Sequence, residues 1–368
     1  MAIGILSEIS TSPIMYIIYY IPIMLFIFYV QKLQAYMILS EVSRSLIKLE
    51  KLKNESRNQT IEYVNKNLKP NELPAKKIDQ ILEYFTIMPI STDPNGIVRK
   101  MEHILTVRED RMKKEVQKFN SSGNSLQISA AENMFEISEA LNSIYKMTRH
   151  FYQIGKRTKS FFMLVQIQMI LPIILEMSTA LTEAMTTIKN HQPIGDGIGP
   201  MIASKFMIKG KKENIAKDTL LTKTKFEGRA LHVIKAEGPN GSVGEVGEGV
   251  YKLVEDMKIK PKIIIMIDAA LKLEGEKTGD IAEGIGAAIG GIGVDKFKIE
   301  EVASNNSIPL YAIIVKQTMV DAISVMKKEI AESSEEVMTR ITRTIKEKSK
   351  RGDDVIIVGV GNTLGVGQ

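Results

Sequence analysis

The sequence predicts an N-terminal transmembrane helix, an all-α middle region and a C-terminal α/β domain with a mostly parallel sheet. An uncharged apolar run at 13–30 indicates the first part, and a scarcity of strand patterns over 32–190 indicates the second. Apolar strands that alternate with helices from residue 230 onward indicate the third. We therefore expect a membrane segment at 1–31, a helical domain at 32–190 and an α/β domain at 191–368.

The composition narrows the possible functions. The chain has 368 residues, enough for roughly two domains. Its net charge of +6 mildly favours an anionic surface, either lipid or nucleic acid. It has no cysteine, which excludes disulfides, thiol catalysis and cysteine-based zinc sites. The four histidines are far apart in the sequence, which argues against a histidine-rich metal site.

The apolar run at 13–30, PIMYIIYYIPIMLFIFYV, is long enough to cross a bilayer as a helix of about 27 Å. A cleaved signal peptide needs a positively charged start, whereas the residues before this run include Glu8 and no lysine or arginine. A buried core helix is the alternative, and the unbroken apolar run disfavours it. We expect a retained single-pass anchor in the cell membrane, so the lipid bilayer is the first predicted partner.

The charges on either side of the run predict its orientation. Basic residues follow the run and none precedes it; they are Lys32, Arg44, Lys48, Lys51 and Lys53. By the positive-inside rule the N-terminus is outside and the bulk of the chain is cytoplasmic. The oligomeric state stays open.

The middle region is expected to be helical throughout. After an amphipathic helix that leaves the membrane, the apolar periodicity predicts helices over 76–86, 95–118, 129–156 and 160–188. The stretch 161–175 is strongly apolar but contains Gln166, Gln168 and Pro172. We interpret it as a core helix, with a second membrane segment or hairpin as the alternative. This region contains no chemical motif.

The C-terminal part alternates strands and helices. We expect strands at 230–236, 262–267, 310–315 and 354–360, and helices near 247–258, 319–332 and 334–350. Continuous apolar strands with helical crossovers predict a parallel sheet that is covered on both faces. Sites in such sheets lie beyond the carboxyl ends of the strands, where Asp268 and the loop Gly359–Asn362 are found.

The last strand is followed by a glycine loop, whereas a strand of this kind normally leads into a helix. A suitable helix start lies far upstream, at Ile194–Ala203. If these two segments meet in space, the domain is a circularly permuted α/β fold, and Asp196 comes close to Asp268.

Val358–Asn362, joined in space to Gly195–Pro200, resembles the strand, glycine loop and acidic helix start of the hydrogenase maturation proteases. Ile267–Ala270 and the Gly199-Pro200 pair are similar to motifs of the spore germination protease. The whole chain also resembles an uncharacterised archaeal family of membrane-anchored proteins. The protease resemblance implies a permuted peptidase-like, or phosphorylase/hydrolase-like, fold over 191–368.

This resemblance implies roles for particular residues. Asp196 and Asp268 match the two functional acids, which are either a catalytic pair or, in the hydrogenase proteases, metal ligands together with a histidine that has no equivalent here. The matched loop residues imply substrate contacts; they are Gly197, Gly199, Gly359, Gly361 and Asn362. Two close carboxylates can share a proton, so that one activates water and the other protonates a leaving group. The same oxygens could instead hold a divalent cation such as Mg²⁺ or Ca²⁺.

We therefore expect a membrane-anchored, cytoplasm-facing hydrolase-like protein that acts on a peptide or protein substrate with an aspartate pair. Asp196 as a simple helix cap and Asp268 as a turn residue are the structural alternatives. Gly284–Gly290 looks like a phosphate loop but does not immediately follow a strand. Gly197–Phe206 also fits the hairpin of helix-hairpin-helix nucleic-acid binders, with Lys205 inside it and Lys209, Lys211 and Lys212 after it. A non-catalytic membrane scaffold that has kept a peptidase-like fold is the third possibility.

Overall fold

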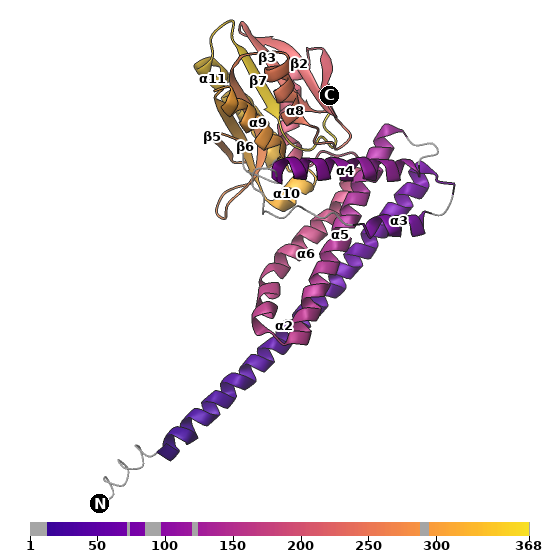
Figure 1. Ribbon diagram of the computed structural model, residues 1–368, viewed down its shortest axis with the longest axis vertical. Helices are drawn as coiled ribbons and strands as arrows, with labels where there is room; N and C mark the ends of the chain where they lie inside the picture. The colour runs from indigo at the N-terminus through magenta and orange to yellow at the C-terminus, as the bar shows by residue number, and fades with distance from the viewer. Residues whose placement is uncertain (1–12, 72–73, 85–96, 120–123, 288–293, 368) are drawn as a thin grey trace, which may run out of the picture. The chain divides into compact units, whose positions relative to one another are not determined.

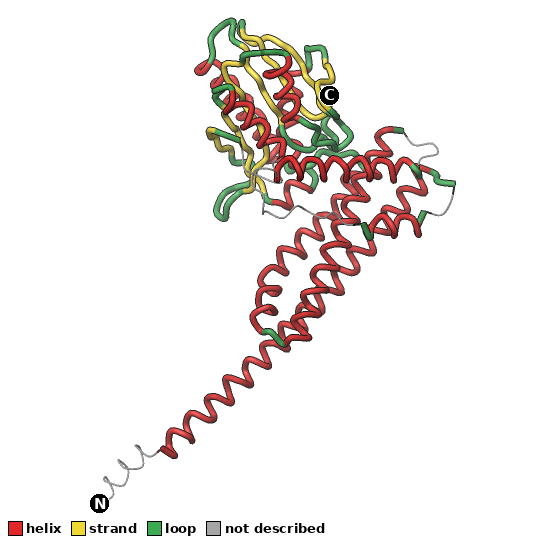
Figure 2. Tube along the Cα trace, in the orientation of Figure 1, coloured by secondary structure: helices red, strands yellow, loops and turns green. Residues whose placement is uncertain are grey.

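The computed structural model describes residues 13–71, 74–84, 97–119, 124–287 and 294–367 (Figure 1; Figure 2). The chain divides into two compact units, each made of segments that are far apart in the sequence. The first consists of Met1–Asn54 with Leu141–Ser178, and the second of Glu55–Ala140 with Thr179–Gln368.

The first unit is built from parts of three long helices. They are α2 (Pro13–Tyr63), α5 (Ser125–Thr158) and α6 (Phe161–Lys189). Side chains one turn apart on α2 pack against a matching row on α6, and the core consists of Ile38, Val42, Leu46, Leu164, Ile167 and Leu171. The apolar N-terminal run and the amphipathic stretch after it therefore form one continuous helix, because α2 runs through residue 31 without a break.

Two helices are long and apolar enough to cross a membrane, within the ranges that the structure describes: Ile17–Leu68 and Phe161–Lys189. The predicted apolar N-terminal helix is thus present. Its described side chains from Ile17 to Ile27 are all exposed, as expected of a segment whose apolar groups are covered by lipid. Its orientation across a membrane stays a prediction.

The helical part of the second unit begins with the end of α2. It continues with a π-helical turn η1 (Val64–Leu68), α3 (Ala75–Leu82), α4 (Ile97–Gln117) and the first half of α5. The Thr60 hydroxyl lies 2.9 Å from that of Ser138, so α2 and α5 share a buried polar contact. The predicted helices over 76–86, 95–118, 129–156 and 160–188 correspond to α3, α4, α5 and α6, although residues 85–96 lie outside the described ranges.

The rest of the second unit is a seven-stranded sheet with the order β1-β2-β3-β7-β4-β6-β5. The strands are β1 (Lys212–Ala216), β2 (Thr219–Phe226), β3 (Arg229–Ala236), β4 (Pro261–Leu271), β5 (Ile281–Ile285), β6 (Leu310–Gln317) and β7 (Asp354–Gly359). All four predicted strands are present, as β3, β4, β6 and β7.

The prediction of a mostly parallel sheet is wrong, because the sheet is mixed. The four central strands β3, β7, β4 and β6 are parallel, whereas the pairings β1-β2, β2-β3 and β5-β6 are antiparallel. Turns of two residues connect β1, β2 and β3, and turns this short can only join antiparallel neighbours. Glu227 and Gly228 both have positive φ, which is the geometry of a type I′ hairpin turn.

Helices cover both faces of the sheet, as predicted. On one face α7 (Ile198–Met207) and α11 (Lys328–Lys348) pack onto the sheet through Ile202 and Ile341. On the other face lie α8 (Val246–Tyr251), the π-helical turn η3 (Lys252–Asp256) and α9 (Val294–Asn305), which bury Val250 and Val302 (Figure 1).

The helix expected at 319–332 is not continuous. It consists of α10 (Met319–Ile323), closed by a capping box between Thr318 and Asp321, and the first turn of α11. An isolated bridge between Ile194 and Val325 separates the two helices. This bridge joins the segment between α10 and α11 to the segment that leads into α7.

Candidate active site

The predicted meeting of the two glycine segments is confirmed. The loop after β7 lies against η2 (Gly195–Gly197), the single 3₁₀ turn that leads into α7. The backbone N–H of Asn362 donates to Oδ2 of Asp196 at 2.8 Å. Asp196 therefore binds the loop after β7, and neither η2 nor α7 has a side-chain cap. The alternative of a simple helix cap is not what the structure shows.

The glycines at this junction are required by close packing. A Cβ on Gly199 would lie 2.2 Å from the carbonyl oxygen of Val360 and 2.6 Å from that of Ile267. Gly361 has φ +132°, and a Cβ there would lie 2.1 Å from the Asp196 carbonyl oxygen. Gly197 and Gly359, like these two, are buried. Their contact with a substrate stays a prediction, since packing alone accounts for glycine at these positions.

The same burial argues against a helix-hairpin-helix element. Gly197, Gly199 and Pro200 are covered by the loop after β7 and are not presented to a phosphate backbone. Lys205, one of the lysines that would grip a phosphate, donates instead to the Ser334 hydroxyl at 2.8 Å.

Asn362 holds a second loop in place. Its Nδ2 donates to the carbonyl oxygen of Gly241 at 3.0 Å, and its Oδ1 accepts from the N–H of Leu364 at 2.8 Å. Its side chain thus joins the loop after β7 to the loop between β3 and α8. The predicted role in substrate binding stays a prediction, because these bonds already use the amide group.

Asp268 lies near the carboxyl end of β4 and is 2% exposed. Its Oδ1 accepts the N–H of Ala269 at 2.8 Å, and its Oδ2 forms an ion pair with Lys296 of α9. Burial raises the pKa of the Asp268 carboxyl to about 7; Lys296 opposes this rise and the charge of Asp196 adds to it. This carboxyl group can therefore gain or lose a proton near neutral pH.

Asp196 is only partly buried and shares one electrostatic neighbour, Lys296, with Asp268. Burial raises the pKa of its carboxyl, while the Asn362 N–H and Lys296 act in the opposite direction. The charge of Asp196 raises the pKa of Asp268, and Lys296 lowers the pKa of both carboxyl groups, so the three charged groups form one cluster at the carboxyl edge of the parallel strands.

Lys296 is the residue that the sequence did not reveal. It lies in α9, at 294–305, a stretch for which the sequence pattern predicted no helix. Its partner Asp268 belongs to a different element, so no local motif links the two residues.

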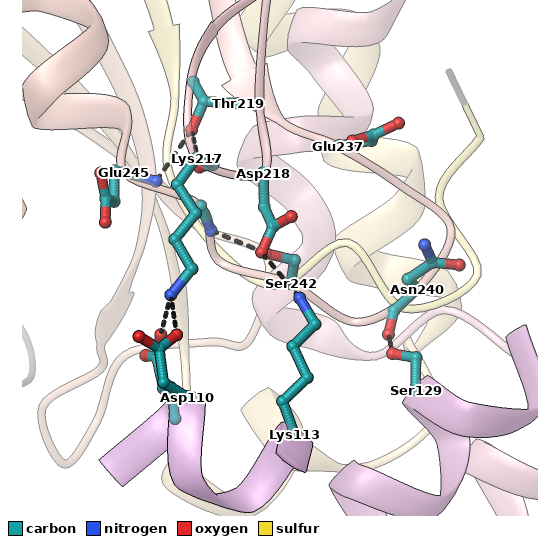
Figure 3. Close-up of polar contacts among 12 residues, drawn as sticks. Asp110, Lys113, Ser129, Lys217, Asp218, Thr219, Glu237, Asn240, Ser242 and Glu245 are labelled. Atoms are coloured by element: carbon teal, nitrogen blue, oxygen red, sulfur yellow. Dashed lines mark hydrogen bonds and ion pairs between the residues drawn. The ribbon is translucent and has the colours of Figure 1, made fainter. Parts of the chain in front are cut away.

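A cavity of about 500 Å³ is lined in part by Asn362, the residue that bonds to Asp196, but not by Asp196, Asp268 or Lys296 themselves. It lies among α4, α5, the β1–β2 turn, the β3–α8 loop and the start of α9. Figure 3 shows its polar wall, where Lys217 contacts Asp110 at 2.8 Å and Lys113 contacts Asp218 at 3.6 Å. The Ser129 hydroxyl, from α5, donates to the carbonyl oxygen of Asn240.

Most of the described charged residues that line the cavity are acidic. The nine acids are Glu102, Glu109, Glu132, Glu136, Asp218, Glu237, Glu245, Glu248 and Asp295, and the three lysines are Lys113, Lys217 and Lys298. Burial raises the pKa of Glu132 to about 7 and that of Asp295 to about 6, although the Gly247 N–H opposes the second shift. Crowded carboxylates of this kind favour a cationic group over an anionic one.

A resident metal does not fit the aspartate pair. The Lys296 ammonium already lies against the Asp268 carboxylate, where a cation would bind. Among the described residues, no group of three or more histidine and acidic side chains is arranged to hold a metal ion. We therefore derive no chemical step through a metal.

Comparison with known protein families gives two matches that together cover nearly the whole chain. Residues 16–191 match the N-terminal domain of the "protein of unknown function (DUF1512)" family, and residues 194–367 match its C-terminal domain. No curated protein matches the chain. Neither family description mentions a protease, so the resemblance to the hydrogenase maturation proteases gains no support from these matches. The chain belongs to the DUF1512 family, with both of its domains present in order.

Proposed function

We propose that this chain is a membrane-anchored, hydrolase-like protein that cleaves an amide bond with Asp196, Asp268 and Lys296. The observation that carries the proposal is the Asp268 carboxyl, buried beside Lys296 with a pKa of about 7 and influenced by the charge of Asp196. Two carboxyl groups whose environments hold one proton between them near neutral pH are suited to general acid–base chemistry.

The exposure of the two acids suggests their roles. Asp196 is the more exposed, so we assign it the activation of water. It accepts a proton as the water oxygen bonds to the carbonyl carbon, and the C–N bond then breaks as Asp268 gives its proton to the leaving nitrogen. Lys296, held against Asp268, offsets the second negative charge and orients that carboxyl group.

The acidic cavity next to Asn362 supports a class of substrate. A ligand-sized cavity lined by carboxylates suits a peptide with lysine or arginine side chains near the bond that is cleaved. Because the apolar segment of α2 is followed by basic residues, we place the site on the cytoplasmic side of the membrane.

A non-catalytic membrane scaffold is the second candidate. The observation that favours it is the burial of Asp268, which is only 2% exposed and forms an ion pair with Lys296. A buried ion pair of this kind can serve structure alone.

The test is cleavage of a peptide library by the full chain in detergent, with and without a metal chelator. We compare the unchanged protein with Asp196→Asn, Asp268→Asn and Lys296→Gln. Glu283→Gln serves as the control, because Glu283 is an exposed carboxylate that pairs with Arg340 and Arg343 of α11, the helix on the face of the sheet opposite α9.

We expect both aspartate variants to lose at least about 100-fold in kcat/KM, the usual scale for a lost acid or base. Lys296→Gln should also shift the pH profile, and Glu283→Gln should cleave normally. If the unchanged chain cleaves nothing, or if the Asp196→Asn/Asp268→Asn double variant cleaves equally well, the scaffold is the better description.

A further inference from the structure

The turn between α5 and α6 combines exposed cations with exposed aromatic side chains. Lys156, Arg157 and Lys159 are exposed, and within the described residues none of them is in an ion pair. Directly after them, Phe161 and Phe162 open α6, and Phe162 is 72% exposed. Aromatic rings beside basic side chains are characteristic of protein surfaces that contact lipid headgroups.

The turn is held closed by local contacts. The Ser160 hydroxyl accepts the N–H of Met163 at 3.4 Å, an N-cap arrangement at the start of α6. Gly155 lets α6 approach α5, because a Cβ there would lie 2.6 Å from Cδ2 of Leu164. The basic and aromatic side chains are therefore presented together at the turn of one helical hairpin.

Contacts between α2 and α6 fix the level of this turn. Gln168 donates to Glu41 at 2.6 Å, and further along both helices Lys189 donates to Gln59 at 3.0 Å. The residue numbers rise together, so α2 and α6 run in the same direction. Phe161, seven residues before Gln168, is therefore level with a point about 10 Å before Glu41 on α2.

That level corresponds to the edge of the membrane. The apolar segment of α2 ends at Val30, about 6 Å from the position on α2 that is level with Phe161. The headgroup layer on each side of a bilayer is about 5–7 Å thick. The side chains at the start of α6 also tilt toward its N-terminus, which is the membrane side.

The same level argues against α6 as a second span. Its apolar residues beyond Gln168 lie beside the part of α2 that carries Glu41, Arg44 and Lys48. Charged side chains lie in hydrocarbon only at a large cost, so this part of α2 lies outside the bilayer core. The α6 residues at the same height therefore lie outside it too.

We propose that the α5–α6 turn docks on anionic phospholipid headgroups of the bilayer that α2 spans. Lys156, Arg157 and Lys159 bind the phosphates, and Phe161 and Phe162 enter the interface. The docking rests on the proposed anchoring by α2, and gives the protein a second attachment to the same membrane surface.

The chain has no tryptophan, so single tryptophans report position without background. We would reconstitute the full chain in vesicles that carry quenching nitroxide lipids, with and without phosphatidylglycerol. The probes are Phe162→Trp at the turn, Phe26→Trp in the apolar segment, and Phe151→Trp as a control. Phe151 is also exposed but lies about 10 Å from the end of α5.

We expect a headgroup-labelled lipid to quench Phe162→Trp several-fold more than Phe151→Trp, and phosphatidylglycerol to increase the difference. Charge reversal by Lys156→Glu, Arg157→Glu and Lys159→Glu together should remove most of this quenching while Phe26→Trp is unaffected. If Phe26→Trp is quenched but Phe162→Trp behaves like Phe151→Trp, the docking is wrong and the anchor stands.

Two other results would also overturn the docking. If Phe26→Trp is not quenched by a lipid labelled deep in its acyl chain, the anchor itself fails, and the docking fails with it. If Ile173→Trp is quenched as strongly as Phe26→Trp by a lipid labelled deep in its acyl chain, α6 crosses the membrane.

Discussion

The backbone N–H of Asn362 donates to the Asp196 carboxylate at 2.8 Å, and this bond joins the loop after β7 to the turn before α7. An unpaired N–H in a partly buried loop costs about 1–3 kcal/mol. We expect Asp196→Ala to lower the unfolding free energy by that amount. Asp196→Asn keeps an acceptor oxygen and should lose much less. Chemical denaturation of the full chain in detergent, followed by circular dichroism, measures both; equal losses would contradict the assigned bond.

The buried Asp268 carboxyl makes stability depend on pH. Its pKa rises from the ordinary 3.8 to about 7 in the folded chain, so the folded state holds the proton more tightly than the unfolded state. Stability should therefore fall as pH rises from about 4 to about 7, by at most about 4 kcal/mol, and then level off. Asp268→Asn should flatten this decline in denaturation curves recorded across that range. If the unfolding free energy of this variant falls with pH as steeply as that of the unchanged chain, another group causes the pH dependence.

Asp321 should give the opposite dependence. Burial alone would raise the pKa of its carboxyl, but bonds from Lys327, Thr318 and Thr278 outweigh burial and lower it to about 2. Its contribution is present above pH 4 and is lost as pH falls toward 2, an effect on the order of 2 kcal/mol. Asp321→Asn should lose this acid sensitivity and be less stable at neutral pH. Acid unfolding of the two proteins provides the comparison, and identical midpoints would refute the assignment.

Gly199→Ala should be strongly destabilising. The new Cβ would lie 2.2 Å and 2.6 Å from two backbone carbonyl oxygens, and backbone cannot move aside cheaply. Overpacking of this severity costs about 3 kcal/mol or more. Gly284→Ala is the matched control, because a Cβ there meets nothing within 4 Å, and we expect a change within about 0.5 kcal/mol. Melting temperatures of the two variants test the contrast; similar values would mean that α7 does not pack this tightly.

The apolar strands were predictable because each is buried on both faces. The predicted ranges 230–236, 262–267, 310–315 and 354–360 fall within a few residues of β3, β4, β6 and β7. The strands β1, β2 and β5 were missed. They lie at or near the edges of the sheet, where half-exposed strands carry lysine, glutamate and threonine rather than an apolar run.

The candidate site divides in the same way. The closeness of Asp196 to the loop after β7 follows from a local rule, that a parallel strand leads into a helix start, applied across a gap in sequence. Lys296 could not be found by such a rule, because its position beside Asp268 depends on how α9 packs on the sheet. The break between α10 and α11 likewise depends on a long-range bridge, between Ile194 and Val325.

The place of β7 in the sheet has a consequence for how the domain is assembled. β7 lies between β3 and β4, although all six other strands precede it in the sequence. Until residues 354–359 have been synthesised, the hairpins of β1–β3 and the group β4, β6 and β5 have no strand to join them. By then the apolar part of α2 has long left the ribosome, so the sheet closes only after the N-terminal segment has had time to insert in a membrane. A ribosome stalled before β7 would leave two unpaired inner strand edges, which are sites for aggregation.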